Sequence, residues 1–146
     1  MKESLNELLV YLFNHIMDIE RNELITGEFS DITTNDMHII EAVGLKGHRN
    51  MSAVAQQLGI TVGTLTITIN RLVKKGYVIR QRSEKDKRVV HLALSEKGQC
   101  AYAHHQQFHE QLIDGVIEHL SKEELQVLTK ALSGLIDYFR QTNEPE

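Results

Sequence analysis

Hydrophobic residues recur with a helical period along most of the chain, and this period changes only between residues 77 and 94. Spacing of i, i+3 and i+4 predicts amphipathic helices over residues 4–24, 34–43, 52–58, 62–75, 95–120 and 122–139. Alternating positions at 77–82 and 89–94 predict two strands joined by a charged tip, 83–88. The expected fold is mainly α with one two-stranded hairpin, and residues 44–50 are expected to form a loop.

Polar residues with capping chemistry mark the starts of several of these helices. Ser4 stands three residues before Glu7, which is the spacing of a capping box. Ser121 and Glu124 repeat that spacing. Single N-caps are expected at Thr33 or Thr34, at Ser52 and at Thr61.

The middle of the chain has the layout of a winged helix-turn-helix. The helices at 52–58 and 62–75 are separated by a three-residue turn and followed by the hairpin, which forms the wing. This motif reads duplex DNA by placing its second helix in the major groove. We expect a single domain, 1–146, with a DNA-binding region at about 33–98 and dimerisation helices at 1–26 and 99–142.

The second helix of this motif has one apolar face and one face suited to DNA. Ile67 is rotated by about 200° from the apolar position Leu65, so it points outward, where it suits contact with thymine methyl groups. Gly63 permits close backbone approach, and Arg71 and Lys74 would reach phosphates. The alternative is that the motif is a packing corner or a protein-contact module. The expected DNA-binding residues of this helix are Thr61, Gly63, Thr64, Ile67, Thr68, Asn70, Arg71 and Lys74.

The distribution of charge favours nucleic-acid binding, although the whole chain carries a net charge of −4. Eleven basic and three acidic residues lie between Lys46 and Lys97, which gives this stretch a net charge of +8 and the remainder −12. A basic middle between acidic ends indicates a local surface that faces phosphate.

The tip of the hairpin is the second cationic feature. Lys85, Lys87 and Arg88 are expected to reach phosphates or the minor groove, whose negative potential attracts arginine. Asp86 would repel DNA, so its expected role is to hold Arg88 or the turn. A solvated surface hairpin is the alternative interpretation.

Several other classes of protein are disfavoured. A single cysteine, Cys100, rules out an internal disulfide framework, fits a reducing cytoplasm and is expected to be a small buried hydrophobe. The apolar run 8–13 is broken by polar residues, so we expect neither a signal peptide nor a membrane span. A nucleophile elbow, a phosphate-binding loop and an HExxH motif are all missing from the sequence, so we do not expect an enzyme.

Histidines supply the one candidate metal site. His105 and His109 stand four residues apart on one helix face, which is the spacing of zinc ligands, and His38 with Glu20 or Glu23 could complete the site. Each histidine is also explicable as a hydrogen-bonded interior group. The expectation is that no cofactor is required, with zinc as the alternative.

The order of elements along nearly the whole chain resembles the MarR family of bacterial transcription regulators, and two stretches are the most specific. Residues 85–98, KDKRVVHLALSEKG, are similar to the wing signature of that family, an Asp-x-Arg followed by a valine-bearing strand, then Leu-Thr/Ser and Gly. Residues 72–78, LVKKGYV, are similar to the stretch in which the second helix of the family's helix-turn-helix ends and the first strand of the wing begins. The resemblance implies a homodimer that mostly represses, with Arg88 entering the minor groove and Asp86 supporting it.

Within that family, shorter stretches are similar to the repressors of type II fatty acid synthesis in Gram-positive cocci: residues 36–38, 60–66, 74–79, 88–91 and 108–109. This resemblance implies double-stranded operator DNA and acyl carrier protein with a long acyl chain, the co-repressor, as partners. Candidate residues to line an acyl site are Phe13, Ile16, Met17 and Ile40, which are equally ordinary core. The Glu/His constellation is also similar to zinc-sensing members of the family, which implies a zinc-responsive regulator as the alternative.

Overall fold

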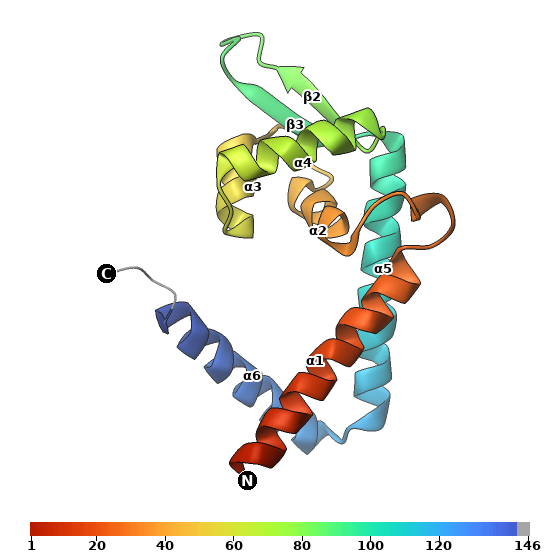
Figure 1. The fold of residues 1–146 in the computed structure, drawn as a ribbon, viewed down its shortest axis with the longest axis vertical. Coiled ribbons are helices and arrows are strands. Elements are labelled where there is room, and N and C mark those ends of the chain that lie inside the picture. The colour runs from red at the N-terminus through yellow and green to blue at the C-terminus, as the bar shows by residue number, and fades with distance from the viewer. Residues whose placement is uncertain (143–146) are drawn as a thin grey trace. The chain divides into compact units, whose positions relative to one another are not determined.

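The computed structural model describes residues 1–142, and the chain divides into two compact units, Met1–Phe108 and His109–Glu146. Within the described residues the helices are α1 (Lys2–Leu24), α2 (Thr34–Val43), α3 (Met51–Leu58), α4 (Val62–Lys74), α5 (Glu96–His119) and α6 (Lys122–Thr142), with a short 3-10 turn at Gly27–Phe29 (Figure 1). The strands are β1 (Arg49–Asn50), β2 (Val78–Arg82) and β3 (Val90–Leu94). The expected mainly-α winged helix is confirmed. The last four residues of the expected domain, 143–146, lie outside the described part.

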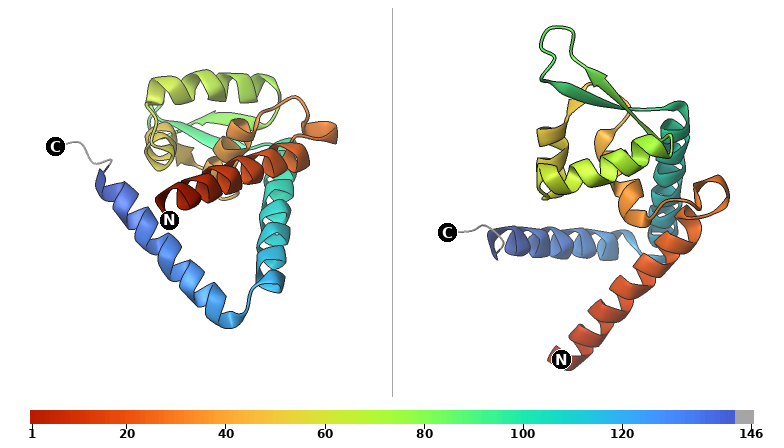
Figure 2. Two further views of the ribbon diagram at one scale, coloured as in Figure 1. Left: turned by 60° about the horizontal axis from the view of Figure 1, so that its bottom comes forward. Right: turned by 45° about the horizontal axis from the view of Figure 1, so that its top comes forward.

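The sheet has three antiparallel strands in the order β1-β3-β2, where two were expected. Strands β2 and β3 pair from Val78 opposite Leu94 to the tip, and they project past α3 and α4 as the wing (Figure 2). Strand β1 pairs with the other edge of β3, with Arg49 opposite Leu92. The prediction that 44–50 is only a loop was therefore wrong at its last two residues. Two residues are too few to show an alternating pattern in the sequence.

The helix-turn-helix is held by caps at each of its corners. The Asn50 side chain accepts the backbone N–H of Ala53 at 2.7 Å, so Asn50 caps α3 and the expected cap at Ser52 was wrong. Gly59 ends α3 at φ +65°, a left-handed conformation that glycine adopts without strain. Thr61 accepts the backbone N–H of Thr64 at 3.1 Å, as expected. The chain direction turns by 107° between α3 and α4, which is typical of this motif.

Of the two expected capping boxes one forms and one does not, and a further box forms at Thr33, where only a single cap was expected. Thr33 and Asp36 bind each other's backbone N–H at the start of α2. Ser121 and Glu124 do the same before α6. The box expected at Ser4 was wrong, because α1 already begins at Lys2 and has no side-chain cap. Lys and Glu are themselves good helix formers, so nothing stops the helix from extending to the chain end.

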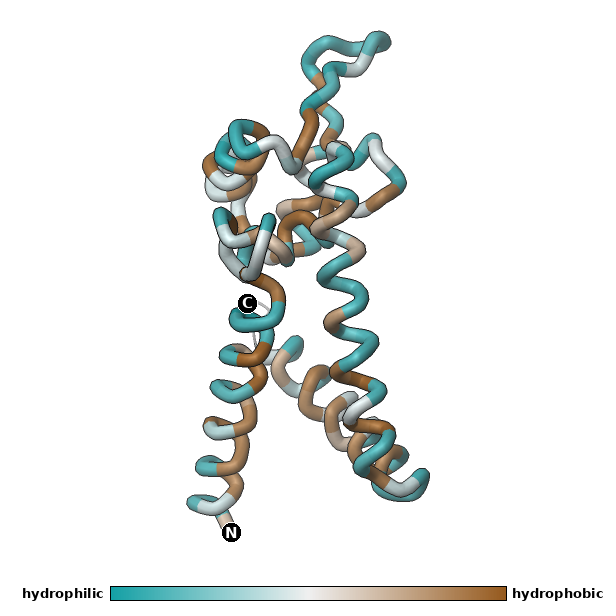
Figure 3. The backbone as a smooth tube through the Cα atoms, turned by 90° about the vertical axis from the view of Figure 1, so that its right-hand side faces the viewer, coloured by the Kyte–Doolittle hydropathy of each residue, from teal (hydrophilic) through white to brown (hydrophobic). Residues whose placement is uncertain are grey.

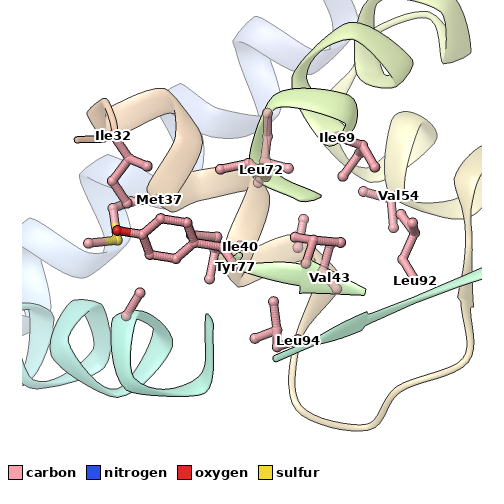
Figure 4. Packing of buried hydrophobic residues seen from close by; sticks show 14 of the residues in the cluster. Ile32, Met37, Ile40, Val43, Val54, Ile69, Leu72, Tyr77, Leu92 and Leu94 are labelled. Atoms are coloured by element: carbon pink, nitrogen blue, oxygen red, sulfur yellow. The ribbon is translucent and has the colours of Figure 1, made fainter. Parts of the chain in front are cut away.

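The hydrophobic core of the first unit positions α4. Leu65, Ile69 and Leu72 are fully buried, which confirms the predicted apolar face, and Ile69 and Leu72 gather with buried residues of α2 and the strands (Figure 4). Tyr77, also fully buried, donates a hydrogen bond from its hydroxyl to Asp31 Oδ1 at 2.6 Å. Helix α4, which is the expected DNA-reading helix, therefore shares one core with the wing and α2.

No single helix within residues 1–142 is both long enough and apolar enough to cross a membrane; α3 and α4 meet those limits only jointly, as a bent pair. Most of the apolar side chains of α3 and α4 that supply this hydropathy belong to the core just described or pack against it.

Candidate nucleic-acid interface

The exposed face of α4 carries most of the residues expected to read DNA. Ile67 is 69% exposed, although it is a large apolar residue. Thr61, Gly63 and Thr64 are exposed at the start of the same helix, and the hydroxyl of Thr61 donates to that of Thr64 at 2.9 Å. An exposed isoleucine among short polar side chains suits a groove that offers both methyl groups and hydrogen-bonding base edges.

Thr68 does not belong to this exposed face. Its side chain is buried, at 9% exposure, so the prediction that it points toward DNA was wrong. Thr68 follows Leu65 by three residues, a rotation of about 300° that brings it back beside the apolar stripe. A hydroxyl in that position serves packing within the protein rather than base contact.

Asn70 and Arg71 are exposed, but each is already engaged with another element. Arg80 of β2 donates to Asn70 Oδ1, and Arg71 Nη2 donates to Asp36 Oδ1, both at 2.5 Å. Asp36 is fully buried, whereas the side chain of Arg71 is 44% exposed. The phosphate contact expected of Arg71 stays a prediction, and its ion pair with α2 has no local signal in the sequence.

The wing tip is exposed and cationic, as expected. Lys85, Lys87 and Arg88 are all exposed. Asp86 Oδ1 accepts the backbone N–H of Arg88 at 3.0 Å, and its carbonyl accepts that of Val89 at 2.9 Å. Asp86 therefore shapes the turn through the main chain, which leaves the cationic side chains free to point away from the protein.

Two further arginines that were not among the expected residues lie between the reading helix and the wing. Arg80 and Arg82 are exposed on β2, and Arg80 donates to Asn70 of α4. They help to line a hollow of about 410 Å³ together with Met51, Thr66, Asn70 and Val90. The sequence did contain a signal for these two residues. They are arginines two residues apart on a strand, and alternation places both on one face of that strand, which follows the reading helix. Their charge and position suit phosphate contacts.

Three of the five candidate metal ligands come together in the first unit. Glu20 of α1, His38 of α2 and His105 of α5 each offer a ligand atom, and these atoms lie within 4.8 Å of one another. His38 Nε2 is 2.7 Å and His105 Nε2 is 3.9 Å from Glu20 Oε1. Neither Glu23 nor His109 is a member of this group.

A carboxylate lies beside the second ring nitrogen of His105, as is usual for histidines in metal sites. His105 is buried, at 1% exposure, and its second ring nitrogen, Nδ1, lies 3.9 Å from Glu41 Oε2. Metal-binding histidines usually direct their other nitrogen to a carboxylate or carbonyl, which orients the ring. The rings of His38 and His105 meet edge to face, with centroids 5.8 Å apart.

Cys100 and three of the four candidate acyl-lining residues are exposed rather than buried. Cys100 is exposed on α5, so its interpretation as a buried hydrophobe was wrong. Phe13, Ile16 and Met17 are also exposed, at 65%, 38% and 48%, on α1. Ile40 is fully buried in the core. Three of the four apolar candidates thus form one exposed stripe of α1, at i, i+3 and i+4.

Comparison with known proteins places these features in a family context. A family model described as the MarR family matches residues 30–89. The HTH-type transcriptional regulator YwhA of Bacillus subtilis, itself described as uncharacterized, is 29% identical over 86 residues, which are 59% of this chain and 62% of that protein. SarZ of Staphylococcus saprophyticus is 34% identical over 68 residues, 47% of each chain. The chain thus spans between about half and three fifths of the length of these curated relatives.

Solved structures extend the likeness to the whole chain. The structure of Streptococcus pneumoniae FabT in complex with DNA has a TM-score of 0.92 and 36% identity, and the match covers 98% of this chain and 100% of that one. A complex of S. aureus MepR with DNA has a TM-score of 0.72 at 18% identity, covering 90% and 96% of the two chains. A mutant of E. coli MarR with operator DNA has a TM-score of 0.67 at 24% identity, covering 88% and 91%. The last two likenesses show the fold alone.

Proposed function

Because this chain belongs to the MarR family and is a DNA-binding transcription regulator rather than an enzyme, we propose that it is a homodimeric cytoplasmic repressor of type II fatty acid synthesis genes. It binds a palindromic operator, and acyl carrier protein with a long acyl chain is its co-repressor. The observation that carries the proposal is the likeness, over the full chain, to FabT bound to DNA. The finer assignment to fatty acid genes rests on the short stretches that resemble that branch of the family.

DNA recognition in this proposal uses two elements of the first unit. Helix α4 enters the major groove, where Ile67 contacts a thymine methyl group and Thr64 a base edge or phosphate. The wing follows the backbone, and Arg88 reaches the adjacent minor groove. Arg80 and Arg82, between the two elements, contact phosphates.

Exposed apolar side chains on both terminal helices support the homodimer. None of the described residues of α6 is buried, and Leu132, Ile136 and Phe139 are each at least half exposed. Leu8 and Leu12 are exposed to a similar degree on α1, along which apolar residues recur (Figure 3). Helices in proteins are stabilised mainly by packing an apolar face, so a second copy covers these faces. A two-fold axis would then place two reading helices about 34 Å apart, one turn of DNA.

The exposed stripe Phe13, Ile16 and Met17 supports an apolar effector. Burying one methylene group of an acyl chain stabilises the complex by about 0.8 kcal/mol. Several exposed apolar side chains can therefore bind a long acyl chain. A co-repressor acts by binding the DNA-competent arrangement more tightly than others. The stripe lies on a helix expected at the dimer interface, where a ligand can change the separation of the reading helices.

Zinc regulation is a second candidate, favoured by the group of Glu20, His38 and His105. Ligand atoms of one tetrahedral Zn²⁺ with bonds of about 2.0–2.2 Å lie roughly 3.3–3.6 Å apart, so these side chains, whose ligand atoms lie within 4.8 Å of one another, would have to shift slightly to surround the ion. The carboxylate of Glu41 beside His105 Nδ1 is placed to orient that ring. Bound zinc would supply a cation that holds α1, α2 and α5 together. Without zinc, the hydrogen bond between His38 and Glu20 joins only α1 and α2.

One experiment separates the two candidates. Binding of the purified protein to a palindromic promoter fragment upstream of fatty acid synthesis genes of its own genome is measured by fluorescence anisotropy. It is repeated with long-chain acyl carrier protein, with the unacylated carrier as its control, and with zinc or a chelator. Tightening by the acylated carrier alone, indifferent to chelator, supports the fatty acid repressor. Zinc-dependent binding that ignores the acyl group contradicts it and favours the zinc-responsive regulator.

A further inference from the structure

A buried carboxylate joins helix α2 to the reading helix α4. The side chain of Asp36, the third residue of α2, is only 1% exposed. Its Oδ2 accepts the backbone N–H of Thr33 at 2.9 Å, and Thr33 Oγ1 accepts the backbone N–H of Asp36 at 3.1 Å. Its Oδ1 accepts the hydrogen bond from Arg71 Nη2 at 2.5 Å. One carboxylate therefore closes the cap of α2 and holds a cation of α4 that is 35 residues away in sequence.

This ion pair differs in kind from the other contacts of α4 with the core. Leu65, Ile69 and Leu72 bury one side of the helix through apolar contacts, and the hydrophobic effect is non-directional. Such contacts orient the buried face of the helix by shape and have no preferred bond direction. A guanidinium–carboxylate hydrogen bond has a preferred distance and direction. The bond from Arg71 to Asp36 therefore constrains the rotation as well.

The place of Arg71 on the helix makes that constraint matter for DNA reading. Arg71 follows Ile67 by four residues, so the two side chains are neighbours on the helix surface. Binding constellations must be held within about 0.5 Å and 10–20° of their productive geometry. A rotation of α4 larger than this would move Ile67 and Thr64 off the base edges.

A second tether of α4 is weaker. Arg80 of the wing donates to Asn70, but both side chains are exposed, so water competes for the same hydrogen bond. Asp36 is shielded from water, and removing one partner of a buried pair leaves an uncompensated charge. The tether to α2 is therefore the stronger of these two side-chain links.

We propose that Asp36 is a positioning residue for operator recognition, which acts through Arg71 to hold α4 in the rotation that base discrimination requires. Asp36 itself does not touch DNA. Arg71 in this role contributes to sequence discrimination, beyond the uniform phosphate contact that its position in the helix predicts. The inference rests on the proposed DNA-binding function and adds to it the residue that orients the reading helix.

The test compares the unchanged protein with Asp36→Asn, Arg71→Lys and Lys74→Gln. Asp36→Asn keeps an oxygen that can accept the Thr33 N–H but removes the charge. Arg71→Lys keeps the charge but removes the planar fork of donors. Each protein is titrated with the operator duplex and with a scrambled duplex at two salt concentrations, and its unfolding in urea is measured in parallel.

The first two variants are expected to lower the ratio of operator to scrambled affinity roughly tenfold, with little change on scrambled DNA. Lys74→Gln, the control for an exposed cation on the same helix, is expected to weaken both duplexes together and to reduce the salt slope by about 1. The urea data separate loss of folded protein from loss of discrimination. If Asp36→Asn does not fold, Arg71→Lys, at a half-exposed side chain, decides the test.

Two results would overturn the positioning role. Asp36→Asn could raise the affinity for both duplexes equally, which would mean that Asp36 acts only as a charge that repels phosphate. Alternatively, both variants could keep the operator preference of the unchanged protein. The operator preference of the unchanged protein is measured before any variant is compared. If the unchanged protein does not prefer the operator at all, that result contradicts the proposed function rather than the positioning role.

Discussion

Gly98 of α5 packs against the backbone carbonyl of Tyr77 so closely that a Cβ at residue 98 would come within 2.1 Å of that oxygen. Ser95 reinforces this contact, because its backbone N–H donates to the Tyr77 oxygen at 3.0 Å, and its hydroxyl lies within hydrogen-bond distance of the carbonyl oxygens of Gly76 and Tyr77. The Gly98 N–H in turn donates to Ser95 Oγ at 3.0 Å. These contacts hold the start of α5 against Tyr77, the residue directly before strand β2 of the wing. The glycine that closes the wing signature serves packing rather than DNA contact.

Gly98→Ala is therefore expected to destabilise the protein by at least about 1–3 kcal/mol, the usual cost of overpacking, because the obstructing atom belongs to the backbone and cannot swing aside. The free energy of unfolding in urea measures this. Gly115→Ala, in the same helix, is the matched control, since a Cβ there meets nothing within 4 Å. The control is expected to gain roughly 0.5–1 kcal/mol from its better helix propensity. Equal stability of the two variants would refute the contact.

The hydrogen bond from Tyr77 to Asp31 predicts a dependence of stability on pH. This bond, with a smaller contribution from Lys97, lowers the pKa of Asp31. Burial, followed by the bond to Asp31, raises the pKa of Tyr77. A lowered carboxyl pKa adds stability above the unfolded value, about 4, and this stability is lost as pH falls through the folded-state pKa. The raised phenol pKa makes stability fall above about pH 10.

Tyr77→Phe is accordingly expected to reduce the free energy of unfolding by about 1 kcal/mol at pH 7, because it removes one hydrogen bond. The difference from the unchanged protein should begin to shrink below about pH 4 and vanish as pH falls through the lowered pKa of Asp31. Urea unfolding at pH 7 and pH 3 measures both values. In an Asp31→Asn background, the effect of Tyr77→Phe should no longer depend on acid pH. A difference that stays constant from pH 7 to pH 3 would argue against the pairing.

Ile67→Ala is expected to weaken binding to the operator by about 1 kcal/mol if Ile67 buries a thymine methyl group. The same duplex with uracil in place of that thymine lacks the methyl group and serves as the control. The unchanged protein should lose affinity on the uracil duplex, and Ile67→Ala should lose nothing further. Equal loss by Ile67→Ala on operator, uracil and scrambled duplexes would show that the side chain reads no methyl group.

Arg88→Ala is expected to weaken operator binding by about 1–3 kcal/mol per subunit, because an arginine in a minor groove is held by its negative potential. Lys87→Ala, the neighbouring exposed cation, should weaken operator and scrambled DNA alike and lower the salt slope by about 1. Anisotropy titrations at two salt concentrations distinguish the two variants. Unchanged affinity of Arg88→Ala at both concentrations would remove the wing tip from the interface.

The sequence alone predicted features that depend on local periodicity and capping. Leu65, Ile69 and Leu72 follow the helical repeat, and they are buried in the structure as the repeat requires. Thr61 caps α4 because a threonine before an apolar helix can bind the free N–H groups of its first turn. All the residues that make up each of these signals lie within a few positions of one another, so each signal can be recognised in a short stretch of sequence.

Features that depend on partners far along the chain could not be predicted in this way. Nothing near Asp36 indicates that Arg71 will pair with it. Strand β1 forms only because β3 offers it an open edge. Thr68 was misplaced for a different reason: its polar side chain suggested an exposed position, although its place three residues after Leu65 puts it beside the apolar stripe. Local chemistry thus predicts the elements, and the fold decides which side chains of each element remain available to a ligand.

The central claim, a homodimer that reads a palindrome with two copies of α4, is tested most directly by the affinity of the unchanged protein for three duplexes. These are the palindromic promoter fragment, the same fragment with one half-site scrambled, and a fully scrambled fragment. We predict that the intact palindrome binds at least about 10³-fold more tightly than scrambled DNA, and that scrambling one half-site removes much of this preference. Equal affinity for all three duplexes would contradict the account.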